Sequence, residues 1–244
     1  MIISHSRKFI FIKPRKVAGT SVEVALAQYC GEEDIITENV LLNEIDETTA
    51  RDFRRNDTGF FNHMRSKRIK KQVGEKIWNS YYKISIVRNP WDMLVSRYFW
   101  NKKNATPRKS VGEVCGEILK APSQTHLYGK LFFAMKRTLL REEISPEDSF
   151  DAFLKKLPHN ASNTSYYFDD HGKPYCDFVI RFEHLQEDFD TVCEHLELPH
   201  TEIPQLKTKV RTSRDYTSFY TSETRAWVEK EFAQEINAFG YTFE

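Results

Sequence analysis

The sequence has few of the features that mark membrane-spanning, secreted or metal-binding proteins. Its 244 residues contain no apolar run close to the ~20 residues that a transmembrane helix needs. The four cysteines are scattered, and no two of them have the CxxC spacing of a redox or zinc site. The first apolar strand begins almost at residue 1, so we expect no signal peptide. We therefore expect a cytoplasmic protein with reduced, packed thiols.

A large net charge is also missing. Lysine and arginine number 36, aspartate and glutamate number 35, and the formal net charge is +1. No overall field therefore attracts nucleic acid or a membrane surface, and basic residues matter only where they cluster. The histidines lack zinc-site spacing and the HExxH motif is absent, so we predict no metal. The 40% of hydrophobic residues suffice for a single domain over residues 1–244.

Residues 8–29 have the pattern of a strand, a basic turn and a helix. Phe9 to Ile12 form a short apolar run, as in a buried parallel strand. Apolar residues then recur at helical spacing, at Val22, Ala25, Leu26 and Tyr29. A strand that enters a helix through a turn of small residues directs backbone N–H groups and the positive end of the helix dipole at one point. Such a point favours a phosphate or sulfate group.

The turn itself carries suitable side chains. Lys16 can reach a bridging oxygen, Gly19 lets the backbone approach closely, and hydroxyl donors follow at Thr20 and Ser21. The loop is not the nucleotide-binding GxxxxGK[ST] motif, because its lysine precedes its only glycine. An ordinary strand-to-helix turn with a few basic residues is the alternative. The candidate anion ligands are Lys13, Arg15, Lys16, Val17, Ala18, Gly19, Thr20 and Ser21.

A second strand and helix follow at residues 82–100. Residues 84–87 indicate a buried strand, Arg88 lies at its carboxyl end, and Asn89-Pro90 opens a helix. Arg88 offers a bidentate fork to a phosphate, and Ser96, about two turns further on, offers a hydroxyl. Open α/β sheets bind ligands at this edge, so we predict a second anion site there. A packed strand–helix junction without a ligand is the alternative.

Both blocks resemble motifs of sulfotransferases. The order Lys-x-Ala-Gly-Thr-Ser after a strand resembles their 5′-phosphosulfate-binding loop. Arg-Asn-Pro, with a serine eight residues after the arginine, resembles their 3′-phosphate-binding motif. The likeness is closest to the carbohydrate sulfotransferase branch, such as the heparan sulfate 2-O-sulfotransferase type and bacterial relatives, and covers the first hundred and the last eighty residues. One departure is Met93, where many relatives carry an arginine.

The resemblance implies an enzyme that uses 3′-phosphoadenosine 5′-phosphosulfate (PAPS) as co-substrate and needs no metal. It would move a sulfuryl group to a hydroxyl of an acceptor, a saccharide or a small metabolite. His63, a lone histidine that says little by itself, matches the position of the base in some members, and Lys16 would stabilise the leaving oxygen. Lys209 and Arg211 lie in a basic loop before the last helix, which would contact the 3′-phosphate or close the site; a solvent-exposed loop is the alternative.

We expect an α/β fold, with a P-loop-like parallel β-sheet flanked by helices. A helical insert over about residues 101–160 would shape the acceptor cleft. The basic segment Arg65–Lys71 indicates a helix whose face is either solvated or a patch for a polyanionic acceptor. We also expect Arg181 and Glu183 to be buried partners, and one final helix capped by Thr221 or Ser222.

Two other functions remain open from the sequence. One is a P-loop-like kinase acting on a small molecule, which requires Mg²⁺ and an acidic ligand at a strand end. The other is a non-catalytic nucleotide- or glycan-binding protein. Binding of the desulfated nucleotide with and without Mg²⁺, together with transfer of radiolabelled sulfate, would separate both from a sulfotransferase.

Overall fold

The computed structural model describes residues 1–37, 54–103, 147–158, 161–206 and 215–244. In these ranges five strands form one sheet in the order β3-β1-β2-β4-β5. The strands are β1 (Ile2–Ser4), β2 (Phe9–Phe11), β3 (Ile35–Ile36), β4 (Tyr82–Val87) and β5 (Phe178–Arg181). The expected α/β fold, a sheet flanked by helices, is confirmed.

The sheet has a parallel and an antiparallel part. β2 runs parallel to β4, with Phe9 opposite Tyr82, and β4 runs parallel to β5. β1 runs antiparallel to both β2 and β3. Four residues connect β1 to β2, which is enough for a hairpin but far too few for the crossover that a parallel pair needs. The parallel part therefore comprises β2, β4 and β5, and the two predicted anion loops follow β2 and β4.

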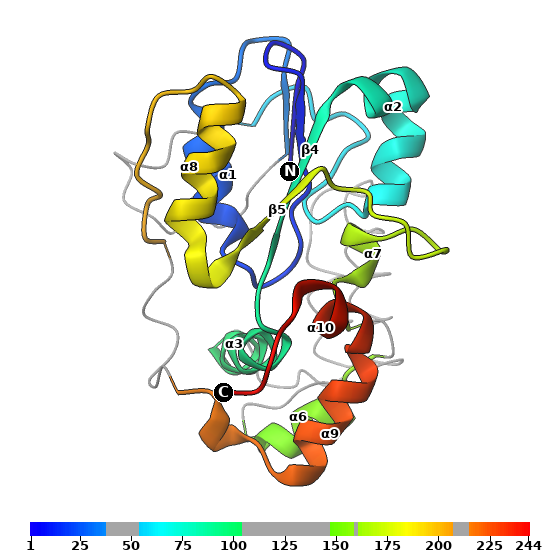
Figure 1. The fold of residues 1–244 in the computed structure, drawn as a ribbon, viewed down its shortest axis with the longest axis vertical. Coiled ribbons are helices and arrows are strands. Elements are labelled where there is room, and N and C mark those ends of the chain that lie inside the picture. Colours follow the sequence, from blue (N-terminus) through cyan, green and yellow to red (C-terminus); the bar gives the residue numbers. More distant parts are fainter. Residues whose placement is uncertain (38–53, 104–146, 159–160, 207–214) are drawn as a thin grey trace, which may run out of the picture.

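The helices lie on both faces of the sheet and beyond one end of it (Figure 1). α1 and α8 cover one face, and α2 and α7 lie on the other. α3, α6, α9 and α10 form a layer beyond the carboxyl end of β4. The helices are α1 (Gly19–Ala27), α2 (Ser66–Ser80), α3 (Pro90–Lys103), α6 (Phe150–Lys155), α7 (Thr164–Tyr167), α8 (Leu185–His195), α9 (Ser222–Glu231) and α10 (Ala233–Phe239).

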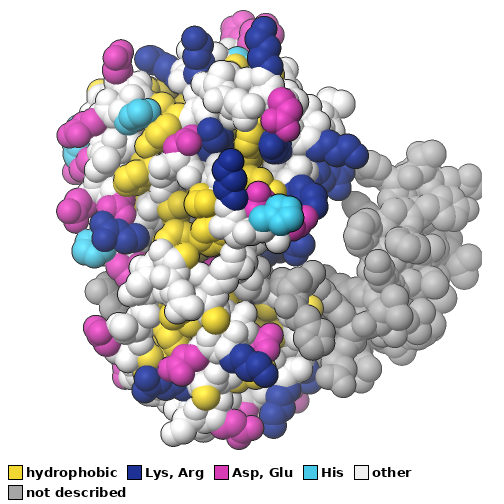
Figure 2. Space-filling view, turned by 45° about the vertical axis from the view of Figure 1, so that its right-hand side comes forward, with side chains coloured by type: hydrophobic (Ala, Val, Ile, Leu, Met, Phe, Trp, Pro, Cys, Tyr) yellow, Lys and Arg dark blue, Asp and Glu magenta, His cyan; other side chains and the backbone are white. Residues whose placement is uncertain are grey.

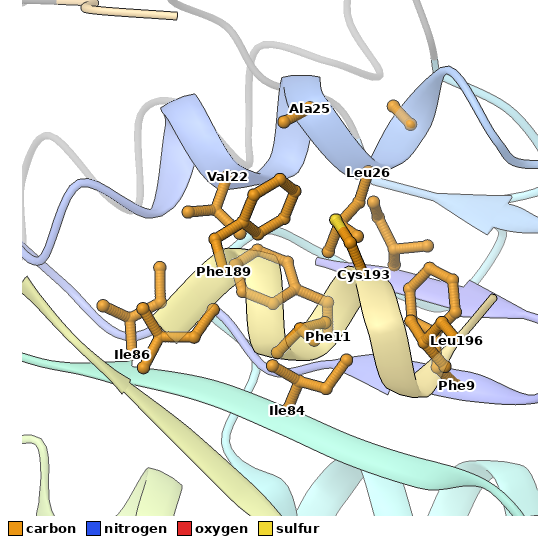
Figure 3. Close-up of a cluster of buried hydrophobic side chains, with 14 of the residues drawn as sticks. Phe9, Phe11, Val22, Ala25, Leu26, Ile84, Ile86, Phe189, Cys193 and Leu196 are labelled. Carbon is orange, nitrogen blue, oxygen red and sulfur yellow. The ribbon is translucent and has the colours of Figure 1, made fainter. Parts of the chain in front are cut away.

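The core follows from the alternation of side chains along β2. Phe9 and Phe11 belong to the apolar cluster under α1 and α8, whereas Ile10 and Ile12 belong to the cluster on the opposite face. In Figure 3, side chains of α1 and α8 point toward those of β2 and β4. The labelled members are Phe9, Phe11, Val22, Ala25, Leu26, Ile84, Ile86, Phe189, Cys193 and Leu196. A strand buried on both faces is apolar throughout, as the sequence of residues 9–12 indicates.

Two predicted helices are interrupted. α2 extends beyond the predicted basic segment Arg65–Lys71, but Gly74 interrupts its helical backbone with a φ of 81°. The predicted single final helix is instead two, α9 and α10, which meet at Phe232, whose backbone is not helical. Thr221 caps α9 as expected, through a capping box with Thr224. Most of the predicted insert, residues 104–146, lies outside the described residues.

Candidate active site

The two predicted anion loops are adjacent. The first loop, residues 13–21, connects β2 to α1, and the second, at Arg88 and Asn89, connects β4 to α3. β2 and β4 are parallel neighbours, so both loops leave the same edge of the sheet. A guanidinium nitrogen of Arg88 (Nη1) donates a hydrogen bond to the carbonyl oxygen of Lys16 at 3.3 Å. The two loops are therefore in direct contact.

The first loop has an unusual backbone. Lys16 and Ala18 have φ values of 65° and 61°, in the left-handed region that non-glycine residues rarely occupy. Such residues cost about 1–3 kcal/mol each and concentrate at functional sites. Ala18 also stands at the N-cap of α1, where its side chain cannot cap the helix. The start of α1 therefore directs backbone N–H groups into the loop without a side-chain cap.

Lys13 lies inside the protein. Its side chain is 2% exposed, and its Nζ lies 2.5 Å from the Glu23 carboxylate on α1. A Cβ added to Gly19 would lie 2.7 Å from Lys13 Cγ, so this position admits only glycine while Lys13 holds its place. Packing against Lys13 therefore requires glycine at position 19, in addition to the close approach of an anion that the sequence suggests.

The other side chains of the first loop are more accessible. Arg15 is exposed, and the Lys16 ammonium lies over the Trp100 ring, 4.2 Å from its centroid. Thr20 is half-buried, whereas Ser21 is buried and its Oγ accepts a hydrogen bond from the backbone of Leu206 at 3.4 Å. The loop thus presents a cationic side chain next to an aromatic ring at the end of α3.

His63 lies against the first loop. Its Nδ1 is 3.0 Å from the carbonyl oxygen of Lys13, and Tyr166 donates its hydroxyl to the His63 carbonyl at 2.9 Å. A carbonyl oxygen only accepts hydrogen bonds, so Nδ1 carries the proton in this contact. Nε2 of the neutral ring then keeps its lone pair, as a proton acceptor requires. His63 also has a left-handed backbone, with a φ of 59°.

The surroundings keep His63 neutral. Burial, followed by the positive charge of Lys13, lowers the pKa of His63 from 6.5 to about 3, and Arg15 adds to the same effect. The hydrogen bond to the Lys13 carbonyl opposes this shift. The imidazole is therefore held in its neutral form at neutral pH.

Arg88 is fixed by two neighbours that the sequence motif did not reveal. Its Nε donates to the Asp92 carboxylate at 2.7 Å, one helical turn further along α3. Its guanidinium also stacks 4.0 Å from the centroid of the Phe182 ring, which follows β5. Ser96 is half-buried on α3. Met93, where many relatives carry an arginine, is buried in an apolar cluster with residues of α6 and α9, so its surroundings suit an apolar side chain.

The second loop is also anchored by the C-terminal part of the chain. Asn89 donates its backbone N–H to Glu183 at 2.8 Å and its side-chain amide to the Thr242 carbonyl at 3.0 Å. The expected Arg181–Glu183 pair is wrong, because Arg181 is half exposed and pairs with Asp188 instead. Residues that follow β5 are close to the second loop because β5 is the neighbour of β4.

Acidic side chains lie beside the lysines in the basic segment of α2. Lys67 pairs with Asp170, and Lys70 pairs with Glu75 at 3.1 Å. On the face turned forward in Figure 2, Lys and Arg side chains lie among Asp and Glu side chains. A groove of about 450 Å³ lies here, lined by Lys67, Lys70, Lys71, Gly74, Glu75, Asp169, Asp170, His171 and Tyr175. These pairings favour the interpretation of a solvated helix face.

The site contains residues that sequence reasoning missed, and two predicted ones cannot be placed. Asp92, Phe182 and Asn163 contact the two loops, and of these only Asp92 has a sequence signal, its i+4 spacing from Arg88. Lys209 and Arg211 lie outside the described residues. Within the described ranges, His, Cys, Asp and Glu side chains form no cluster suited to a metal ion. In the same ranges, no helix is long and apolar enough to cross a membrane.

Comparison with known proteins gives the family. A structure of mouse sulfotransferase SULT7A1 complexed with PAP shares 14% identity and a TM-score of 0.42, over 96% of this chain and 86% of that one. No curated protein sequence matches the chain significantly. The model of the sulfotransferase family matches residues 1–242, nearly the whole chain, and therefore covers both loops and the C-terminal part that anchors them. The chain belongs to the sulfotransferase family.

Proposed function

We propose that this protein transfers a sulfuryl group from PAPS to a hydroxyl of an acceptor. The observation that carries the proposal is the contact between the Arg88 guanidinium and the Lys16 carbonyl, 3.3 Å apart. It joins the two loops that resemble the 5′-phosphosulfate and 3′-phosphate sites. One nucleotide with anionic groups at the 5′ and 3′ positions of its ribose can then meet both loops at the edge of the sheet where open α/β folds bind ligands.

In this proposal each loop holds one end of PAPS. The backbone from Val17 to Ser21 and the side chain of Lys16 face the 5′-phosphosulfate, with Arg15 as a further cation. Arg88 and Ser96 meet the 3′-phosphate, joined by Lys209 and Arg211. Lys13 supports the loop from inside, because its ammonium lies against Glu23 and its stem packs on Gly19.

The proposed step is an in-line displacement at sulfur. The acceptor oxygen forms a bond to sulfur while the bond from sulfur to the bridging oxygen breaks. The electron pair of that bond remains on the 5′-phosphate of the product 3′-phosphoadenosine 5′-phosphate (PAP). Lys16 stabilises this developing charge, for which its side chain leaves the Trp100 ring. The acceptor proton passes to Nε2 of His63.

The position of His63 suits a base that becomes stronger when the donor binds. Burial lowers the pKa of His63 to about 3, and the positive charges of Lys13 and Arg15 add to this effect. A bound phosphosulfate brings negative charge to the same loop, which favours the protonated imidazole and raises the pKa. The base then accepts a proton most readily when the donor is in place.

We propose a carbohydrate as the acceptor, on the resemblance to the carbohydrate sulfotransferase branch. We also propose a cytoplasmic location with reduced thiols. Cys30 and Cys176 are free, and burial raises the pKa of each thiol to about 12, so both stay protonated near neutral pH. A screen of hydroxylated acceptors, sugars first, tests the acceptor class.

A titration with PAP and a sulfate-transfer assay together separate the enzyme from its two alternatives. Calorimetric titration with PAP should show binding that does not depend on Mg²⁺, and radiolabelled sulfate should move from PAPS to an acceptor. Mg²⁺-dependent nucleotide binding would favour a kinase instead. PAP binding without transfer to any acceptor would favour a non-catalytic binding protein.

A further inference from the structure

A five-residue segment outside both loops, Asn163–Tyr167, is bonded to the first loop. It consists of Asn163 and the short helix α7. The Asn163 side chain pairs with both backbone groups of Arg15: its Oδ1 accepts the N–H at 3.2 Å, and its Nδ2 donates to the carbonyl oxygen at 3.0 Å. Asn163 is 2% exposed, so water competes little for these bonds.

The same segment also forms hydrogen bonds to the candidate base and to the carboxyl end of β4. The hydroxyl of Tyr166 donates to the His63 carbonyl at 2.9 Å, and that of Tyr167 donates to the Ile86 carbonyl at 2.8 Å. Both tyrosines are buried. Three parts of the proposed site are therefore bonded to one short run of residues.

Asn163 is itself held from α10. The Glu235 carboxylate accepts the backbone N–H of Asn163 at 2.7 Å and the hydroxyl of Thr164 at 3.1 Å. Glu235 is 1% exposed, and α10 lies beside α7 in Figure 1. A buried carboxylate thus supports Asn163, which in turn supports Arg15.

We propose that Asn163 is a positioning residue for the PAPS loop and that Glu235 holds Asn163 in place. This role rests on the donor site proposed above. Arg15 directly precedes Lys16, where the backbone becomes left-handed. Fixing both backbone groups of Arg15 therefore fixes the direction in which Lys16 and the following N–H groups leave. Without this anchor, binding of the donor must itself order the loop, which lowers the affinity for the donor and the precision with which the loop aligns it.

The test compares two nucleotides that share one end. PAP meets both loops, whereas adenosine 3′-monophosphate has no 5′-phosphate and meets only the Arg88 end. By calorimetric competition, Asn163→Ala should weaken PAP binding about tenfold and change adenosine 3′-monophosphate binding by less than about twofold. An equal loss for both nucleotides, or no loss for PAP, would overturn the role of Asn163.

Ser4→Ala is the matched control. It also removes a buried hydrogen bond, from Ser4 Oγ to the Asp34 carboxylate at 2.8 Å, but Ser4 pairs with Phe9 at the end of β2 remote from the loop. It should lower the thermal midpoint and leave PAP affinity unchanged. A PAP-specific loss in Ser4→Ala equal to that in Asn163→Ala would mean that the effect is not positional, and would contradict the proposal.

Two substitutions of Glu235 test the same positioning role, and they are the deciding test if Asn163→Ala does not fold. Glu235→Ala should reproduce the selective loss of PAP affinity. Glu235→Gln should restore most of it, because the amide oxygen can accept the same N–H. Normal PAP binding by Glu235→Ala would overturn the role of Glu235. Failure of the unsubstituted protein to bind PAP at all would instead overturn the donor site.

Discussion

Both loops are held by residues distant in sequence, but the second one (the Arg88 loop) also has contacts with residues close to it in the chain. The Arg88 loop has several local supports: Arg88 pairs with Asp92 four residues on, and the Asn89 side chain accepts the N–H of Trp91 at 3.1 Å. The first loop, which we propose binds PAPS and call the PAPS loop, is held by residues distant in sequence, through the bonds of His63, Arg88 and Asn163 to its backbone. The Arg88 loop therefore combines local side-chain contacts with distant ones to Glu183 and Thr242, whereas these three bonds to the first loop all come from residues far away in the chain.

The largest effect should come from His63, the proposed base beside the PAPS loop. His63→Ala should lower turnover by about 10²–10⁴-fold, the usual contribution of a general base. His63→Asn is the control for position, because its amide nitrogen can still donate to the Lys13 carbonyl while it cannot act as a base. Steady-state kinetics should show the same loss for both. Turnover and a pH profile that survive either change would remove His63 from its role.

The PAPS loop should respond next, through its own cation. Lys16→Ala should lower turnover by about 10²-fold or more, because the leaving oxygen loses its charge partner. Lys67→Ala, on the exposed face of α2, is a control that removes the same charge elsewhere. Single-turnover measurements would show the loss in the chemical step. Near-normal turnover in Lys16→Ala would exclude this residue from catalysis.

The Arg88 loop should show its effect in binding. Arg88→Ala should weaken PAP binding by about 2–3 kcal/mol, the scale of a charge-assisted hydrogen bond. Arg88→Lys should recover little, because lysine cannot supply the bidentate fork. Calorimetric titration measures both variants. Unchanged PAP affinity in Arg88→Ala would mean that the arginine only joins the loops.

The smallest effect concerns the distant support of the PAPS loop. Burial raises the pKa of Glu235 from 4.5 to about 7, although hydrogen bonds from Thr164 and Asn163 oppose this. A carboxyl with a raised folded-state pKa stabilises the protein at low pH, and this contribution is lost as the pH rises from about 4.5 through about 7. The nearby hydroxyls of Tyr167 and Tyr241 stay neutral throughout, because burial raises the pKa of each.

Glu235→Gln should remove this dependence, which amounts to at most about 1.4 kcal/mol per pH unit. Urea unfolding at several pH values would compare the variant with the unsubstituted protein. The free energy of unfolding of the variant should fall less between about pH 5 and pH 7.5. Parallel curves for the two proteins would show that Glu235 does not titrate in this range.

Sequence reasoning was strongest where the information is local. The strand at residues 9–12, the helix opened by Pro90 and its buried stripe of Trp91, Leu94, Val95 and Tyr98 were all predictable, because burial follows the period of each element. It failed where a partner is chosen by packing, as for Arg181, which pairs with Asp188 and not with Glu183.

The sequence by itself determined the family and the two loops, since both rest on short runs with a fixed order of residue types. Only the tertiary structure decided how these residues are used. Lys13 faces inward to Glu23, the His63 pKa falls because burial and two cations surround the ring, and Asn163 reaches Arg15 across 148 positions. The physical reason is that desolvation, charge and hydrogen bonding act through space, and chain order does not show which distant groups meet.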